Sequence, residues 1–309
     1  MIRYILRRIL FLIPVLIGVA FCVFTLLYLT PGDPARMILG DMATENAIKE
    51  FRAKEGLDKP FLLQFGNYIY KAITQGDIGR SYITKRPVMN EIMATFPATL
   101  KLAAFAIVIA VVVGLPCGIL SAIKQYSVFD TLAMIFAMIG LSMPVFWLGL
   151  LLILLFSVHL RWLPPSGFDT FKAMILPSLA LSAQSISMIT RMTRSSMLEV
   201  VRADYIRTAR SKGQKESVVI WVHALHNALI PVVTLCGLQF GHLLAGAILT
   251  ESIFAVPGVG RLMVESIKMR DYPVVQGGVL FVAVAFSVVN LLVDLLYAYI
   301  DPRIKAQYR

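Results

Sequence analysis

Five polar side chains lie within long apolar stretches of the sequence and could line a path for a polar solute. Gln239 and His242 are three residues apart and so share one face of a helix, as do Ser182 and Ser185, while Asn290 lies in the last apolar stretch. Polar groups inside lipid are costly and commonly face a bundle interior or a water-filled path. For any one of these residues alone, hydrogen bonding between helices without transport is the favoured interpretation.

The sequence carries no recognisable catalytic or metal-binding pattern. It contains neither a Gly-x4-Gly-Lys-Ser/Thr phosphate loop nor a His-Glu-x2-His zinc motif. Cys22, Cys117 and Cys236 have spacings that suit neither a metal site nor a disulfide framework. Gly258 and Gly260 in "PGVGRLM" lack the third glycine of a nucleotide-binding loop, so we interpret them as a turn. We therefore expect a chain that is not an enzyme and binds no metal or cofactor.

One basic segment, "DYIRTARSKGQKESVVIWVHALHNALIP", separates two of the most apolar stretches. Ala203, Ile206 and Ala209 recur at a spacing of three residues, which predicts a short amphipathic helix with a small-residue face. Gly213 then supplies a left-handed turn that ends this helix. A face built from alanine fits a groove on another protein better than it holds lipid, although a helix resting on anionic headgroups is the alternative.

The second half of this segment predicts another helix. Apolar residues recur at helical spacing from about Ser217. The helix is expected to end at Pro231, because the missing N–H of proline is best tolerated in the first turn of a new helix. The segment is thus predicted to be helix, glycine turn, helix.

The composition places these residues in a membrane protein. The chain of 309 residues is 58% hydrophobic and only 15% charged, which is too little polar surface for a soluble domain. A run of about 20 apolar residues can cross a bilayer as a helix. We expect an all-α integral membrane protein with six spans, at residues 9–29, 99–120, 131–158, 173–190, 230–249 and 274–300.

The distribution of Lys and Arg predicts the orientation. Most basic residues of the short loops lie on the side of the N-terminus, so both termini are expected in the cytoplasm and the long segment 31–97 outside. Asp294 lies near the cytoplasmic end of the last span, within reach of the inner arginines, and is expected to be structural. The same distribution explains the net charge of +11, so no nucleic-acid partner is expected.

One membrane domain, 1–309, is the simplest organisation, because no repeat or linker divides the chain. It is divided into a first span (1–30), an outer helical cap (31–97), a five-helix core (98–300) that includes the loop 191–228, and a tail (301–309). The cap either shields helix ends or docks an external partner. Small residues at a spacing of four are expected to pack spans closely: Gly114 with Gly118, and Gly237, Gly241 and Ala245.

Longer stretches of the sequence resemble the permease subunits of peptide ABC importers. "DYIRTARSKG" and "HALHNALIPVV" are typical of the dipeptide and oligopeptide branch, and the likeness continues through "LTPGDPA", "GDIGRSY", "SMPVFWLGLLL" and "NLLVDLLYAYIDPRI". The outer segment between the first two spans is similar to that of the B-type permeases. The resemblance implies the type I importer fold.

The resemblance also implies a role for the basic segment. In ABC importer permeases a loop of the form Glu-Ala-Ala, three residues, Gly, nine residues, Ile-x-Leu-Pro is the coupling helix that lies in a cleft of the ATPase. Aligned on Gly213, this chain has Arg207, Thr208 and Ala209 at the Glu-Ala-Ala positions and Leu225 at the leucine. Only Ala209, Gly213 and Leu225 match. With Ala203 and Ile206, these residues are the candidate coupling site.

A set of partners follows from the resemblance. The chain would pair with a second, similar permease, two ATPase subunits would bind ATP and Mg²⁺, and an extracytoplasmic binding protein would deliver the substrate. The location would be a bacterial inner membrane, among its lipids. Dipeptides or oligopeptides are the expected substrates, with nickel or glutathione as alternatives. A secondary carrier without an ATPase and an intramembrane hydrolase are the less favoured classes.

Overall fold

The computed structural model describes residues 2–40 and 42–300 and is built from helices. Within these residues no β-sheet forms, and one isolated bridge joins Arg80 and Pro87. In chain order the helices are α1 (Ile2–Leu29), α2 (Pro34–Leu39), α3 (Glu45–Glu55), α4 (Phe61–Gln75), α5 (Val88–Ile123), α6 (Val128–Ser142), α7 (Val145–Leu152), the π-helix η1 (Ile153–His159), α8 (Phe171–Val201), α9 (Asp204–Ser211), α10 (Glu216–Val218), the π-helix η2 (Val219–Ala224), α11 (Leu225–Gly246), α12 (Ile248–Ile253), α13 (Val259–Lys268) and α14 (Tyr272–Ile300). The all-α prediction is confirmed.

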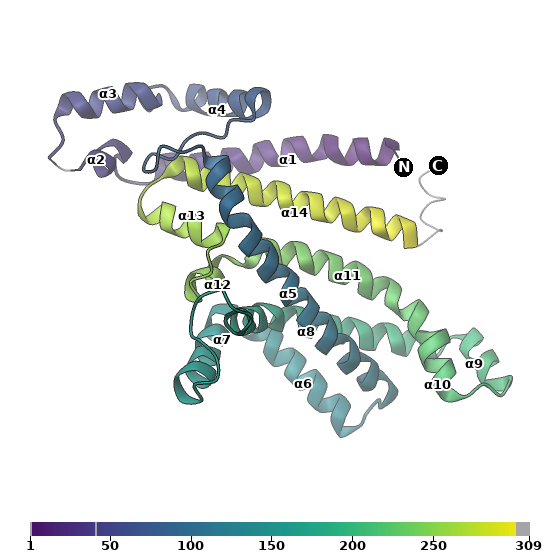
Figure 1. The fold of residues 1–309 in the computed structure, drawn as a ribbon. Helices are drawn as coiled ribbons and strands as arrows, with labels where there is room; N and C mark the ends of the chain where they lie inside the picture. Colours follow the sequence, from purple (N-terminus) through teal and green to yellow (C-terminus); the bar gives the residue numbers. More distant parts are fainter. Residues whose placement is uncertain (1, 41, 301–309) are drawn as a thin grey trace.

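The helices extend between two ends of a bundle. α9 and α10 lie at one end, on the side where α1 begins and α14 ends (Figure 1). The short helices α2 and α3 lie at the opposite end. We call these the loop end and the cap end. The helices α3 and α4 confirm the prediction that the cap is helical.

Five helical segments of the described chain are long and apolar enough to span a membrane: Leu10–Leu29, Val88–Ile123, Phe171–Val201, Glu216–Gly246 and Tyr272–Leu295. A sixth crossing is possible where Val128–Ser142 and Val145–His159 form a pair bent by 107°. The expected count of six is therefore reached if this bent pair crosses as one span.

The prediction of one continuous helix over 131–158 is wrong. The helix breaks at Met143 and Pro144, where Met143 adopts an extended conformation with φ −74° and ψ 129°. Proline disfavours a helical conformation in the residue before it and has no N–H for the helix ladder. The chain therefore turns sharply here and starts a new helix at Val145.

Three other helices are longer than expected. α8 continues to Val201 because neither glycine nor proline interrupts residues 178–201. α5 begins at Val88, so the last part of the expected cap belongs to a span. The predicted end at Pro231 is wrong, since α11 continues through it to Gly246. Spans tolerate internal proline when neighbouring groups satisfy the freed backbone.

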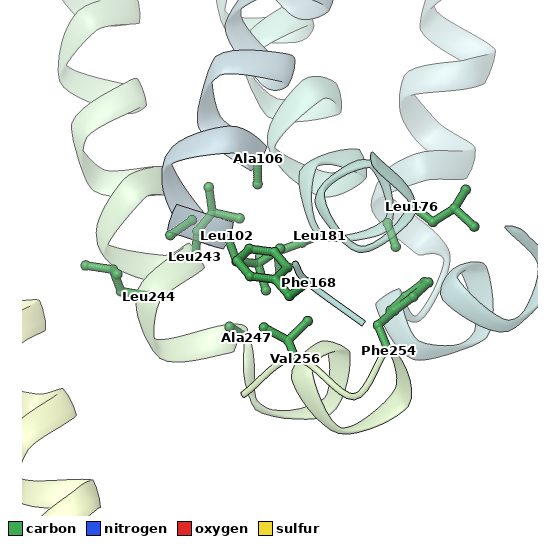
Figure 2. Packing of buried hydrophobic residues seen from close by; sticks show 12 residues of the cluster. Leu102, Ala106, Phe168, Leu176, Leu181, Leu243, Leu244, Ala247, Phe254 and Val256 are labelled. Carbon is green, nitrogen blue, oxygen red and sulfur yellow. The ribbon is translucent and has the colours of Figure 1, made fainter. Parts of the chain in front are cut away.

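The main core lies where α5, α8 and α11 meet the segment around α12 (Figure 2). Leu102 of α5, Leu181 of α8 and Leu243 of α11 pack there with Phe254 and Val256. This contact connects the cap-side segment after α11 to the central spans.

The glycines spaced by four confirm close helix packing. A Cβ on Gly118 would lie 2.6 Å from the backbone oxygen of Thr190, and one on Gly237 would lie 2.4 Å from Cγ2 of Val293. Gly114 and Gly241 face Ile186 and Phe286 at 3.0 and 3.2 Å in the same way. Small residues let helix backbones approach where packing replaces the hydrophobic effect.

Two carboxylates anchor the cap. Asp33 accepts bonds from Ala35 N and, at 2.8 Å, from Nη2 of Arg52. Burial alone would raise the pKa of Asp33, but these bonds outweigh burial and hold the pKa below its usual range. Asp271, just before α14, accepts from the Ser81 hydroxyl and, at 2.9 Å, from Tyr82 N. The cap is thus fixed to the start of the last span.

Candidate functional site

The predicted short helix of the basic segment is α9, Asp204–Ser211. It starts after Ala203, which has an extended conformation, and has Asp204 in its first turn and Arg210 in its last. These charges suit the dipole at each end. Gly213 has φ +76°, which confirms the predicted left-handed turn, and no atom lies within 4 Å of a Cβ added there. The turn therefore needs glycine for its backbone conformation rather than for space.

The small-residue face of α9 is partly covered by this chain. Ile206 is completely buried in a cluster with Ile119 of α5, Met197 of α8 and Val219 of η2. Ala209 and Leu225 pack against the same cluster. This chain's own helix ends therefore cover Ile206 at the centre of the face, whereas Ala203 and Ala209 are only partly buried, so contact of this face with another protein stays a prediction.

The exposed face of α9 is polar. Arg207 and Thr208 are exposed, and so is Tyr205, whose hydroxyl accepts a bond of 2.9 Å from Asn227 Nδ2. Arg210 holds both carboxylate oxygens of Glu216, at 2.7 and 3.1 Å, which ties α9 to α10. A protein that docks here would meet charged and hydroxyl groups rather than alanine.

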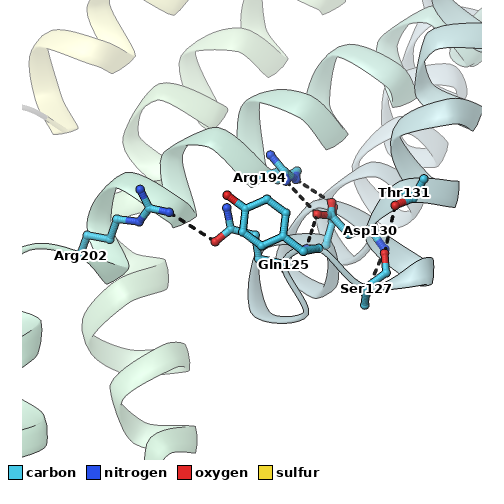
Figure 3. A network of polar contacts seen from close by, with 8 residues as sticks. Gln125, Ser127, Asp130, Thr131, Arg194 and Arg202 are labelled. Carbon is cyan, nitrogen blue, oxygen red and sulfur yellow. Dashed lines mark hydrogen bonds and ion pairs between the residues drawn. The ribbon is translucent and has the colours of Figure 1, made fainter.

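An ion pair joins α6 to α8 (Figure 3). Arg194 donates to both oxygens of Asp130, from Nε at 2.7 Å and from Nη2 at 2.8 Å. Asp130 also accepts from the Ser121 hydroxyl and, at 3.0 Å, from Tyr126 N. One carboxylate thus binds side chains of α5 and α8 and the turn that precedes α6.

Sequence reasoning missed this network. From the sequence, Arg194 is expected in a loop. Its positive charge is used there only to predict which side of the membrane the loop lies on. A local signal was present, because Ser127 and Asp130 have the spacing of a helix N-cap and its third residue, and Ser127 Oγ does accept from Asp130 N at 3.2 Å. Nothing in that signal identifies Arg194 as the partner.

The polar residues expected along one seam do not all meet. Gln239 Nε2 donates to Ser185 Oγ at 3.1 Å, and both residues are buried between α11 and α8. Ser182 is also buried and donates to Leu179 O at 2.9 Å. Ser185 and Gln239 thus form an interhelical hydrogen bond, which is the interpretation favoured for each such residue alone.

The other two seam residues lie apart from this bond. His242 is exposed and packs its ring edge-on against Phe286, with the ring centroids 5.6 Å apart. Asn290 is partly buried, and its Oδ1 has no hydrogen-bond partner within residues 2–40 and 42–300. No shared surface of all five residues is formed in this conformation, so their role in a path stays a prediction.

Asp294 has the arginine partner that its position predicted. Arg8 Nη1 of α1 lies 2.8 Å from Asp294 Oδ2 of α14. The contact links the first and last spans near the loop end.

A second carboxylate cluster, also missed from the sequence, lies at Glu251 of α12. Glu251 is completely buried, and its oxygens accept from Thr99 Oγ1 at 2.6 Å and from Arg261 N at 3.1 Å. Thr99 Oγ1 in turn accepts from Val259 N at 2.9 Å. Burial raises the pKa of Glu251, and these bonds oppose the rise. The cluster ties α5 to the start of α13, which Gly258 caps.

A cavity of about 790 Å³ opens at the cap end. Its walls come from the end of α1, from α3, α4 and the start of α14, and charged residues of both signs line it, among them Arg52, Lys71 and Asp77. Among the residues that the structure describes, no three His, Cys, Asp or Glu side chains gather as a metal site.

Known protein families and relatives match nearly the whole chain. The family described as "Binding-protein-dependent transport system inner membrane component" matches residues 114–306, and that of its N-terminal membrane component matches residues 1–103. The dipeptide transport system permease protein DppB of Alkalihalophilus pseudofirmus is 48% identical, over 99% of this chain and 100% of that protein. The glutathione transport system permease protein GsiC of Escherichia coli K12 is 47% identical, over 99% of each.

Solved structures share the fold. An inward-facing form of the MetNI methionine ABC transporter aligns with a TM-score of 0.59 at 17% identity, over 69% of this chain and 97% of that chain. An amino acid ABC transporter with histidines aligns with a TM-score of 0.53 at 17% identity, over 70% and 94%. These likenesses establish the permease fold of type I ABC importers.

Proposed function

The chain belongs to the family of binding-protein-dependent transport system inner membrane components, and we propose that it is the permease subunit of an ATP-driven importer of small peptides. The full-length identity of 48% to a dipeptide permease is the observation that supports peptides as the substrate class. Glutathione, itself a small peptide, is the alternative suggested by the relatives that are 47% identical. In either case the chain contributes the membrane path by alternating access and not a catalytic group.

The partners are those of such an importer. A second permease completes the membrane path, two ATPase subunits bind ATP and Mg²⁺ at the loop end, and a binding protein delivers the peptide at the cap end. In this arrangement both termini lie in the cytoplasm of the bacterial cell. This places the exposed residues Tyr205, Arg207 and Thr208 against the ATPase.

The buried side of α9 then transmits ATPase movement to the spans. Ile206 packs against the ends of α5 and α8, and the Asp130–Arg194 pair fixes α6 to the same end of α8. A displacement of α9 therefore moves three helices together, because close-packed interiors transmit strain. Ile206, Ala209 and Leu225 act as the inner joint and Arg207 and Thr208 as the contact surface.

Reconstitution tests the substrate. The chain, its partner permease and the ATPases are placed in proteoliposomes with the binding protein, and uptake of a labelled dipeptide, of glutathione and of Ni²⁺ is measured. We expect uptake of the dipeptide that requires ATP and the binding protein, and that an excess of unlabelled dipeptide suppresses. Uptake driven by an ion gradient without ATPase subunits would instead identify a secondary carrier.

Gly213→Val tests the coupling turn. A β-branched residue at φ +76° costs about 1–2 kcal/mol, so the turn relaxes and α9 loses its position. We expect uptake to fall roughly tenfold, and ATP hydrolysis to lose its stimulation by the loaded binding protein. Gly213→Asn is the matched control, because asparagine tolerates the left-handed conformation. Equal behaviour of the two variants would show that the turn does not couple.

A further inference from the structure

The cap helix α4, Phe61–Gln75, carries three different stripes along its length. One stripe, with Phe61, Phe65 and Tyr68, faces the protein, and a second, with Asn67 and Lys71, is polar. Helical periodicity places the remaining apolar residues together between these two stripes: Leu62, Leu63, Tyr70 and Ile73.

The first stripe fixes α4 to the outer third of α1. Phe61 packs edge-on against Phe24 and Tyr28, and Phe65 packs edge-on against Phe21, with ring centroids 5.0 to 5.4 Å apart. Phe21 lies within the segment Leu10–Leu29, which is long and apolar enough to cross a membrane. α4 is therefore held at the depth where α1 leaves the bilayer.

The polar stripe faces water. Asn67 and Lys71 line the 790 Å³ cavity together with Gln64, whose Nε2 donates to Lys59 O at 2.7 Å. Polar side chains of α4 thus have a polar environment within this chain. The apolar stripe lies on another side of the helix and does not line the cavity.

The apolar stripe has no cover in the described chain. Leu62, Tyr70 and Ile73 are 72%, 64% and 68% exposed, although α4 is firmly packed on α1. Exposed apolar residues in a contiguous patch mark a surface that is buried in another environment. Phe21 of α1, itself partly exposed on the apolar span, contacts α4 directly, so the stripe continues the surface that α1 presents to lipid.

From this continuity we propose that α4 is an interfacial helix, with Leu62, Tyr70 and Ile73 inserted into the lipid leaflet at the cap end and Asn67 and Lys71 in water. An amphipathic helix in this position buries its apolar face at the boundary of headgroups and acyl chains. Tyr28 and Tyr70 have the amphipathic character that enriches tyrosine at membrane–water interfaces. The bilayer thereby supports the cap. It also fixes the position of α4, which forms part of the cavity wall, relative to the membrane surface.

Spin labels on α4 test this position in the importer reconstituted in nanodiscs. Cys22, Cys117 and Cys236 are replaced by alanine, and a nitroxide is attached to a single cysteine at position 62, 73, 67 or 71. Its collision rates with O₂, which concentrates in lipid, and with a water-soluble Ni²⁺ chelate are then measured. We expect the ratio of O₂ to Ni²⁺ collisions to be several-fold higher at 62 and 73 than at the control positions 67 and 71.

Two results would overturn the proposal. Equal ratios at all four positions would place the apolar stripe in water. Protection from both reagents at 62 and 73 would show that a protein covers it. Because the readout does not depend on transport, either result leaves the proposed peptide import standing, and failed uptake leaves the interfacial position standing.

Discussion

Asp130→Asn is expected to abolish most coupled transport and to destabilise the permease. The amide keeps the shape of the side chain but removes the charge that balances Arg194. The carboxylate is 6% exposed and the guanidinium 24% exposed, so a cation is left largely buried without its partner. Removing one member of a buried pair costs about 3–5 kcal/mol.

The position of the pair turns this cost into a loss of coupling. Asp130 joins α6 to α5 through Ser121 and to α8 through Arg194. Without it, movement of α9 displaces the end of α8 but no longer carries α6. We expect peptide uptake to fall by more than roughly tenfold, with ATP hydrolysis continuing, and the thermal midpoint of the purified importer to fall as well.

Glu45→Gln is the matched control for this variant. Glu45 and Arg36 lie 2.8 Å apart in the cap, far from α9, with side chains 69% and 57% exposed. Exposed pairs contribute little because water screens them, so coupled transport and stability should be nearly unchanged. If Asp130→Asn behaved like Glu45→Gln, the Asp130–Arg194 pair between α6 and α8 would have no role in coupling.

The sequence predicted the features that depend on local spacing. The positions of the spans, though not their lengths, follow from runs of apolar residues. The close contacts at Gly118 and Gly237 follow from small residues four apart, and the left-handed turn at Gly213 follows from the glycine after a helix. Each of these needs only a few neighbouring residues. The identification of the importer fold likewise rested on segments that can be read directly.

The sequence could not predict which helix faces point inward, or which side chains pair across the bundle. The spacing of Ala203, Ile206 and Ala209 identifies one helix face, yet only the packed structure shows that Ile206 on this face is buried against α5 and α8. Asp130 and Arg194 are far apart in the chain, and so are Thr99 and Glu251. Proline in an apolar run also permits two outcomes, because Pro144 breaks its helix and Pro231 does not. These outcomes depend on neighbours that the sequence does not place.

Gly260→Ala is expected to damage the cap-end cluster around Glu251. A Cβ at position 260 would lie 2.5 Å from Cα of Ile248 and 2.9 Å from Oε2 of Glu251. Backbone atoms cannot rotate away, so overpacking here costs about 1–3 kcal/mol or more.

The damage should reach the spans because Glu251 and Thr99 join α12 and the start of α13 to α5. Displacing Glu251 breaks its bond to Thr99, and a buried carboxylate that loses its donors is strongly disfavoured. We expect a lower thermal midpoint and reduced uptake in proteoliposomes. Gly246→Ala, at the end of α11, is the control, since a Cβ there meets no atom within 4 Å and alanine is the better helix former. Equal losses in both variants would mean that the close approach at Gly260 is not what holds α12 and α13 to α5.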